Sequence, residues 1–213
     1  MMQEPSKAEQ LAALAEQAKN CTACPLAETR TNVVFGEGNP EAPLVFVGEG
    51  PGAQEDATGR PFVGRAGQLL DECLAACKLS RKHVYICNVV KCRACIREGR
   101  SVQNRAPRPA EIDACSRWLD PQLTIISPLV IVCLGAPSAN TLIHSGFRML
   151  AERGQWFSNS RYAPHIMAAL HPAYILRQQG ASFEEARRWL INDIEAARVR
   201  VVEARKAPKL TLF

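Results

Sequence analysis

Cysteines are the residues of this chain with the clearest capacity for chemistry. There are nine of them, and an odd number argues against a closed set of disulfides. Cys21 and Cys24 form a Cys-x2-Cys pair before Pro25, a spacing that lets two thiolates reach one metal centre from a single turn. A second group follows at Cys92, Cys95 and Cys115. Four thiolates from the two groups could hold either zinc or a cubane iron–sulfur cluster, and the spacing does not separate these two.

The elements that must position these thiols follow from the hydrophobic pattern. Short apolar runs predict four strands, at 44–47, 84–88, 129–134 and 165–170. Helical spacing and capping signals predict five helices, at 7–20, 64–79, 109–125, from 135 onward, and at 182–206 behind a Ser182–Glu185 capping box. Strands that alternate with helices predict an α/β fold. We expect a three-layer α/β/α sandwich around a central, mainly parallel four-stranded sheet.

Polar residues gather where the predicted strands end. Three clusters occupy such places: Gly48–Asp56, Asn88–Arg93 and His171–Arg177. Open α/β sheets build their ligand sites from the loops at the carboxyl ends of the strands. The sequence therefore predicts one site at this edge of the sheet. It also predicts a single domain over residues 1–206 and a flexible tail at 207–213.

Composition limits the class of protein. Apolar residues make up 47% of the 213 and charged residues 22%, which is typical of a globular chain. The formal net charge of +5 permits binding to a polyanion without requiring it. Because there is no apolar run of membrane-spanning length and no secretion signal at the start, we expect the protein in the cytoplasm. We also expect a monomer.

Several motifs occur in a specific order. They are Val34–Asp56, Gly59–Leu70, Asn88–Arg93, the separate positions Asn104, Arg105, Pro107 and Pro109, and His171–Arg177. Together they closely resemble family 4 uracil-DNA glycosylases over roughly residues 21–193, and several ordered motifs are far more specific than one. The resemblance implies an enzyme that flips uracil out of DNA and hydrolyses its N-glycosidic bond, which initiates base excision repair.

The resemblance also implies a structural 4Fe–4S cluster, remote from the chemistry. Carried over by position, its ligands are Cys21, Cys24, Cys92 and Cys115. This chain departs from the family pattern by an expansion around residues 94–103, which adds Cys95 as a competitor of Cys92. We favour Cys92 because it keeps its place after Asn88-Val-Val-Lys.

The transition state of such a reaction places negative charge on the departing uracil and positive charge on the sugar. By resemblance, His171 stabilises the charge on the uracil oxygen nearest the sugar. Asn88 offers a donor and an acceptor to the pairing edge of the base, which separates uracil from cytosine. Glu49 positions water or favours the cationic sugar.

Other residues of the motifs are expected to shape the pocket. Phe62 resembles the aromatic side chain that stacks on the flipped base, and Glu55 the residue that crowds the methyl-bearing carbon of thymine. The glycines of the loop after the first predicted strand allow the backbone close to the ligand. These glycines are Gly48, Gly50 and Gly52.

Basic residues cluster between the second predicted strand and the next helix. They are Lys91, Arg93, Arg97, Arg100, Arg105 and Arg108. Phosphate contact is the functional interpretation and a solvated loop the alternative; we expect Arg93, Arg105 and Arg177 to contact DNA. A side chain from Tyr174–Arg177 could wedge into the duplex.

Two alternatives remain open at this point. The chain could be a non-catalytic iron–sulfur DNA-binding module, or a glycosylase of the same superfamily for a different deaminated base. The intact set of Glu49, Phe62, Asn88 and His171 favours the enzyme. The C-terminal Leu210–Phe213 resembles short peptides that dock on bacterial sliding clamps, although a disordered apolar end is the simpler interpretation.

Overall fold

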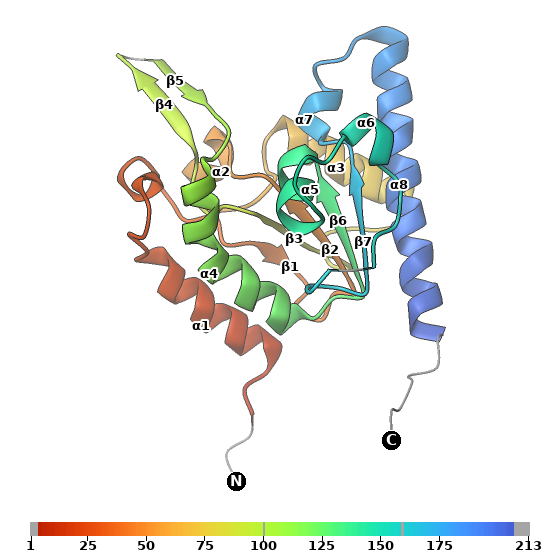
Figure 1. The fold of residues 1–213 in the computed structure, drawn as a ribbon, viewed down its shortest axis with the longest axis horizontal. Helices are drawn as coiled ribbons and strands as arrows, with labels where there is room; N and C mark the ends of the chain where they lie inside the picture. The colour runs from red at the N-terminus through yellow and green to blue at the C-terminus, as the bar shows by residue number, and fades with distance from the viewer. Residues whose placement is uncertain (1–3, 100, 159, 207–213) are drawn as a thin grey trace.

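A mainly parallel sheet lies at the centre of the protein, with helices on both of its faces (Figure 1). The computed structural model describes residues 4–99, 101–158 and 160–206. Within these ranges the central sheet has five strands in the order β1-β3-β2-β6-β7. Their bounds are Glu37–Gly38 (β1), Leu44–Gly48 (β2), Tyr85–Asn88 (β3), Val130–Leu134 (β6) and His165–Ala169 (β7).

All four predicted strands are present, and their three pairings are parallel. The sheet exceeds the predicted four strands because β1 pairs antiparallel with β3 at its edge. Two residues are too few to give an alternating pattern, so the sequence did not reveal this strand. Gly38 shows how close the approach is: a Cβ atom there would lie 2.2 Å from the Val84 carbonyl oxygen.

The alternation of side chains along each strand explains the three layers. In β2, Val45 and Val47 belong to one hydrophobic cluster, whereas Leu44 and Phe46 belong to the other. Successive strand residues point to opposite faces, so a continuously apolar strand must be covered on both sides. The sheet therefore has two cores, one under each layer of helices.

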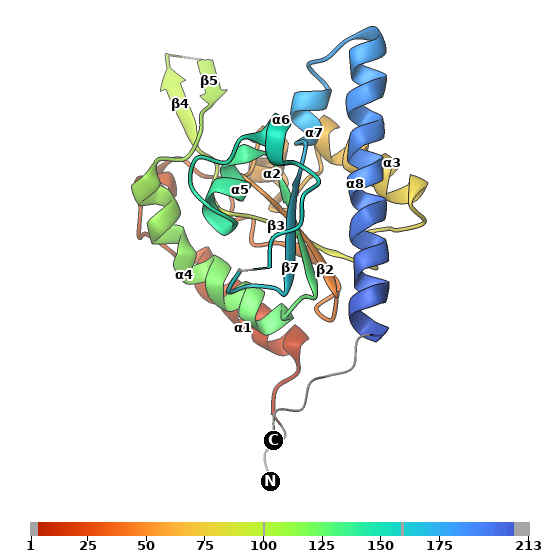
Figure 2. The same ribbon diagram turned by 45° about the vertical axis from the view of Figure 1, so that its right-hand side comes forward.

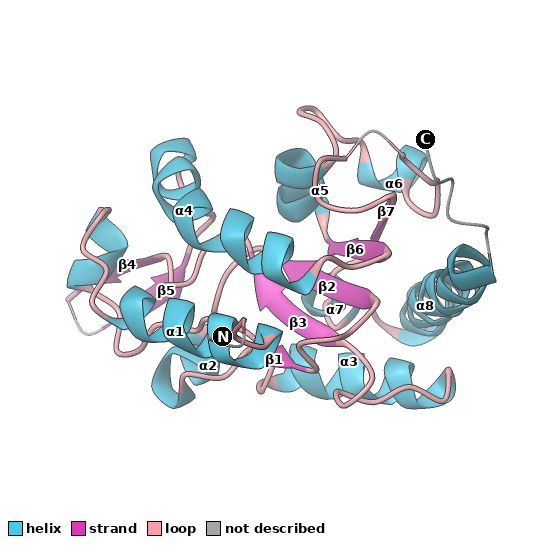
Figure 3. Ribbon diagram, turned by 90° about the horizontal axis from the view of Figure 1, so that it is seen from below, coloured by secondary structure: helices cyan, strands magenta, loops and turns pink. Residues whose placement is uncertain are grey.

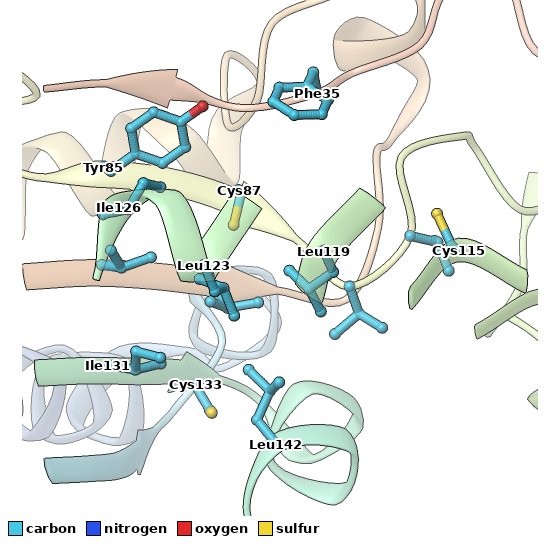
Figure 4. Packing of buried hydrophobic residues seen from close by; sticks show 14 of the residues in the cluster. Phe35, Tyr85, Cys87, Cys115, Leu119, Leu123, Ile126, Ile131, Cys133 and Leu142 are labelled. Carbon is cyan, nitrogen blue, oxygen red and sulfur yellow. The ribbon is translucent and has the colours of Figure 1, made fainter. Parts of the chain in front are cut away.

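One core lies under helices α1 (Lys7–Lys19), α4 (Pro109–Ile126) and α5 (Ala136–Leu142). Figure 4 shows Leu119 and Leu123 of α4 packed over the sheet near Cys87. The other core lies under α3 (Arg65–Ala76), α7 (Pro172–Ile175) and α8 (Gly180–Lys206). The view from below in Figure 3 separates α1 and α4 from α3 and α8 across the sheet, and Figure 2 shows α8 running alongside α7 and α3. No helix in the described ranges is both long and apolar enough to cross a membrane.

The start of α8 corrects one predicted boundary. The helix begins at Gly180, so Ser182 lies inside its first turn and is not its cap. Gly180 has a φ of +53°, which a glycine adopts without strain. The chain can therefore enter the helix two residues earlier than the Ser182–Glu185 pattern indicated.

Several short elements were not predicted. The 94–103 expansion folds into a hairpin of β4 (Cys95–Glu98) and β5 (Ser101–Asn104), which projects from the molecule at the upper left of Figure 1. Four short helical segments were also missed: Pro25–Glu28 (η1), Ala53–Thr58 (α2), Met149–Glu152 (α6) and α7. Segments of four to six residues are too short for a helical period to emerge.

Candidate active site and metal centre

A pocket of about 740 Å³ opens at the carboxyl edge of the sheet. β2 lies between β3 and β6, so the chain connects first to the strand on one side of β2 and later to the strand on the other side. The loops that follow these strands therefore diverge and leave a crevice between them. Loops that follow β2, β3, β6 and β7 form the walls. The predicted site residues among the lining are Glu49, Gly50, Gly52, Glu55, Phe62, Asn88, Arg105, His171 and Arg177.

His171 follows β7 and caps α7, and its ring faces the pocket. The Ala173 backbone N–H donates to His171 Nδ1 at 3.0 Å. Nδ1 is thus unprotonated, and the single proton of the neutral ring lies on Nε2. Burial lowers the pKa of His171 to about 4, with the Arg177 charge acting in the same direction and Glu55 opposing it. At neutral pH the pocket therefore contains a neutral N–H donor.

Asn88 and Glu49 contribute two oxygen atoms that lack partners. Asn88 ends β3 and is 2% exposed, and its Oδ1 is buried with no hydrogen bond to the described residues. Glu49 follows β2, and its Oε1 is equally buried and unpaired. Burial raises the pKa of the Glu49 carboxyl group. Buried polar atoms are nearly always paired, so two unpaired oxygens in one pocket indicate a ligand that completes them.

Phe62 forms part of the wall beside His171, with ring centroids 5.7 Å apart and planes inclined by 32°. Its φ of +51° is unusual for a bulky residue, so the surroundings must hold it. Arg81 donates hydrogen bonds to the carbonyl groups of Pro61 and Phe62. Gly67 makes room for the same backbone, because a Cβ atom there would lie 1.7 Å from the Phe62 carbonyl oxygen.

Glu55 joins the two loops that carry Gly52 and Phe62. Its carboxylate accepts hydrogen bonds from the backbone N–H groups of Gly52 at 3.1 Å, Val63 at 2.9 Å and Gly64 at 2.8 Å. Both oxygens are thereby fixed while the side chain still lines the pocket. The carboxylate fastens α2 to the segment that presents Phe62.

The predicted DNA-contacting arginines lie in different environments. Arg177 is exposed at the pocket, over the Tyr174 ring. Arg105 lines the pocket but pairs with Glu111 through two hydrogen bonds of 2.7 and 2.6 Å. Arg93 donates to Asn104 Oδ1 at 2.7 Å and is not among the lining residues.

Lys91 overturns one interpretation of the basic cluster. It is only 1% exposed, so it cannot contact DNA phosphate. The sequence suggested otherwise because Lys91 stands among surface arginines, whereas its side chain turns inward between β3 and α4.

The rim of the pocket includes residues that no motif indicated. Leu150 of α6 is 73% exposed and lines the rim with Met149. Among the predicted wedge residues, Ile175 is fully buried and cannot enter a duplex, whereas Tyr174 is exposed. A leucine in a short helix between strands carries no sequence signal of this role.

The four cysteines predicted as cluster ligands lie around one small cavity, away from the pocket: Cys21, Cys24, Cys92 and Cys115. Arg30 and Lys91 also line it. Arg30 Nη1 lies 3.6 Å from Cys92 Sγ, and the Lys91 backbone N–H donates to Cys115 Sγ at 3.2 Å. Burial raises the pKa of Cys92 to about 11, although Arg30 opposes this. Such thiols ionise when a cationic metal centre binds them.

Cys95 is not among the residues around this cavity. It lies in β4, paired with Asn104 across the hairpin. Within residues 4–99, 101–158 and 160–206, no three His, Cys, Asp or Glu side chains converge closely enough to hold a single metal ion.

Comparisons with known proteins agree with this architecture. The family model described as the Uracil DNA glycosylase superfamily matches residues 35–202. A type-4 uracil-DNA glycosylase of Thermotoga maritima is 46% identical over 87% of this chain and 91% of its own length. Those of Archaeoglobus fulgidus and Pyrobaculum aerophilum are 41% and 39% identical, covering 79% and 78% of this chain and 84% of each relative. The chain therefore belongs to the uracil-DNA glycosylase superfamily.

Proposed function

We propose that this protein is a uracil-DNA glycosylase that initiates base excision repair by removing uracil from DNA. Its relatives carry the name type-4 uracil-DNA glycosylase. One observation carries the proposal: a neutral N–H donor at His171 shares a pocket with two buried, unpaired oxygens, Asn88 Oδ1 and Glu49 Oε1. Each has a matching partner in a flipped deoxyuridine.

Asn88 reads the pairing edge of the base. Its unpaired Oδ1 accepts the N3–H of uracil, and its Nδ2 donates to O4. Cytosine presents the opposite polarity at both positions, so it would leave buried groups unpaired, at a cost of about 1–3 kcal/mol each. Phe62 stacks on the base, and the fixed side chain of Glu55 crowds the carbon that carries the methyl group in thymine.

Bond breakage is assisted by charges fixed before the reaction. The C1′–N1 bond breaks and its electron pair leaves with uracil, while the sugar becomes cationic. His171 Nε2–H donates to O2 of the departing base. Glu49 stabilises the cationic sugar and orients the water whose oxygen attacks C1′; the proton released from that water ends on the uracil anion.

The arginines at the mouth of the pocket hold the DNA. Arg177 is the most available for a phosphate, Arg93 contributes from the base of the hairpin, and Arg105 acts while paired to Glu111. Tyr174, exposed beside Arg177, is the residue of the predicted set best placed to fill the gap left by the base.

The four cysteines around the small cavity, Cys21, Cys24, Cys92 and Cys115, would hold a 4Fe–4S cluster. Four thiolates suit either such a cluster or zinc, and the resemblance to family 4 glycosylases favours the cluster. When bound, such a cluster would supply structural cross-linking: its ligands would join the turn before η1 to the segment after β3 and to α4.

We expect Cys92→Ser to abolish iron binding, because one ligand of the cluster is lost. Cys95→Ser should leave the iron content unchanged, since its thiol lies outside the cavity. The measurement is iron and acid-labile sulfide per protein chain, with the visible absorbance of the purified variants. The opposite pattern would make Cys95 the ligand and remove Cys92 from the set.

We expect Gly48→Ala to slow excision roughly 10²-fold, because small displacements of reacting groups cost about that much. A Cβ atom at Gly48 would lie 2.4 Å from Asn88 Oδ1 and 2.6 Å from Phe62 Cζ, so both must move. Single-turnover excision measures the effect. Gly146→Ala is the control for a glycine replaced without crowding, since nothing lies within 4 Å of a Cβ atom there, although its φ of +74° strains an alanine; equal losses in the two variants would contradict this account.

Incubation with a uracil-containing oligonucleotide, followed by alkali, tests the function. Abasic sites break in alkali, so strand scission dependent on protein is the expected result. No scission at any protein concentration would overturn the proposal and favour a non-catalytic iron–sulfur DNA-binding module. The same assay with hypoxanthine and other deaminated bases, in single and double strands, defines the substrate range.

Other expectations remain proposals. They are a single domain over residues 1–206, a monomer in the cytoplasm at the nucleoid, and clamp binding by the tail. Leu210–Phe213 lies outside the described residues. Size-exclusion chromatography tests the monomeric state, and removal of the tail tests clamp binding.

A further inference from the structure

Lys91 is a buried lysine that no step above uses. Its Nζ donates to the Asn88 backbone carbonyl at 2.9 Å and to Gln122 Oε1 at 2.5 Å, and it lies 5.5 Å from the centroid of the Phe35 ring. Lysine is almost never fully buried unless it is paired, because its ammonium group loses strong hydration. Among the described residues it makes no salt bridge, so these hydrogen bonds must compensate it.

The first of these bonds reaches the residue that faces the base. β3 ends at Asn88, and two backbone hydrogen bonds continue beyond it, from the Val89 N–H to the Gly48 carbonyl at 2.9 Å and from the Val90 N–H to the Glu49 carbonyl at 3.1 Å. The Lys91 ammonium supplies a donor to the carbonyl at this point and closes a loop of four residues. The Asn88 side-chain oxygen makes no hydrogen bond to the described residues, so the direction of the amide depends on how firmly its backbone is held.

The other contacts of Lys91 lead to α4 and the cysteine cavity. Its backbone N–H donates to Cys115 Sγ at 3.2 Å, and Cys92 is the next residue. Gln122, which accepts from the ammonium, also donates to the Phe35 carbonyl at 3.0 Å and so is itself held in place. Lys91 therefore contacts the cysteine cavity through its backbone N–H and the Asn88 carbonyl, at the end of β3, through its side chain.

We propose that Lys91 is a positioning residue for excision, which fixes the Asn88 backbone and thereby directs the Asn88 amide at the base. The inference rests on the proposed function of Asn88. Lys91 then acts in the interior of the enzyme and not at the DNA surface. Its contact with Cys115 links the cysteine cavity to the residue that recognises the base.

A double-mutant cycle tests this inference. Lys91→Met should slow single-turnover excision of uracil about 10²-fold, the cost of a small misplacement of a reacting group. In an Asn88→Ala background the same substitution should change the rate less than about threefold, because coupled residues are not additive. KM should change little in Lys91→Met, since Lys91 does not touch DNA. If the double variant lost activity by the product of the two single losses, the inference would be overturned.

Two further measurements separate positioning from general destabilisation. Hydrogen exchange of the peptide spanning 85–91 should rise in Lys91→Met and not in Leu190→Ala, a core variant of α8 under the opposite face of the sheet. Iron content should stay at the wild-type level. Unchanged exchange at 85–91, or loss of iron that accounts for the whole rate effect, would reject the proposal.

If Lys91→Met does not fold, Gln122→Met replaces it in the same cycle, because it removes the acceptor that holds the ammonium. The same non-additivity with Asn88→Ala is expected, and additive losses would reject the inference. Wild-type protein that fails to release uracil would instead reject the proposed function. The two failures are therefore distinguishable.

Discussion

His171→Ala is expected to slow single-turnover excision of uracil by about 10²- to 10³-fold, the effect of removing one preorganised donor from a developing anion. The loss should fall on the chemical step, because the Nε2–H of the neutral ring meets O2 more strongly as charge accumulates there. The measurement is the rate with enzyme in excess over a uracil-containing duplex.

His83→Ala is a matched control for this variant. Its Nδ1 accepts from the Ser80 backbone N–H at 3.0 Å, as that of His171 accepts from the Ala173 N–H, but His83 lies on an exposed loop. We expect wild-type excision from His83→Ala. If His171→Ala also excised uracil at the wild-type rate, His171 would have no part in the chemistry.

The pH dependence gives a second test of the neutral ring. Because the pKa of His171 is lowered to about 4, its ring stays neutral as pH falls through 6.5, and the rate should show no step there. The same pKa makes the free energy of unfolding depend on pH, because His171 of the unfolded chain binds a proton near pH 6.5 and that of the folded protein only near pH 4. This group's contribution is therefore fully present above pH 6.5 and is lost progressively as pH falls toward 4. A rise in rate on acidification through 6.5 would indicate a cationic histidine.

The layers of the fold were predictable because they rest on long, regular patterns. Continuous apolar runs gave the four parallel strands, and Pro109 marked the start of α4 to the residue. β1 and the β4–β5 hairpin were not predictable, since their residues carry no apolar alternation. β1 forms against a neighbour distant in the sequence, because Gly38 tolerates the Val84 carbonyl. The hairpin forms locally, because Gly99, with a φ of +58°, allows the turn between its two strands.

The sequence predicted which residues form the candidate site, but not their hydrogen bonding or protonation. Motifs and strand ends brought Glu49, Asn88 and His171 to one pocket, yet a sequence shows neither the unpaired oxygens nor the protonation of the ring. Those depend on hydrogen-bond partners, such as the Ala173 N–H, and on burial. The burial of Lys91 could not be predicted for the same reason, because nothing in a run of basic residues reveals which side chain turns inward.

Asn88→Ala is expected to reduce uracil excision by roughly 10³-fold or more, because sites built to hydrogen-bond a substrate lose about 10⁴- to 10⁵-fold when that pairing fails entirely. The methyl group leaves both N3–H and O4 of the enclosed base without a partner, so the flipped state is destabilised before any bond breaks. Product inhibition by free uracil should weaken in parallel, since the same edge is read in the product.

Asn88→Asp separates the two contacts within this prediction. It keeps an acceptor for N3–H but replaces the donor to O4 by a second oxygen, so it should lose activity on uracil nearly as completely as Asn88→Ala. Asn39→Ala is the control: its Oδ1 accepts from the Glu41 N–H in a surface turn, and its removal should not affect excision. If Asn88→Asp kept the wild-type rate, the base would have to be read by another group, since a carboxylate facing O4 in a buried pocket is repelled by it. Glu49, whose unpaired Oε1 also lies buried in the pocket, would then be the group to test.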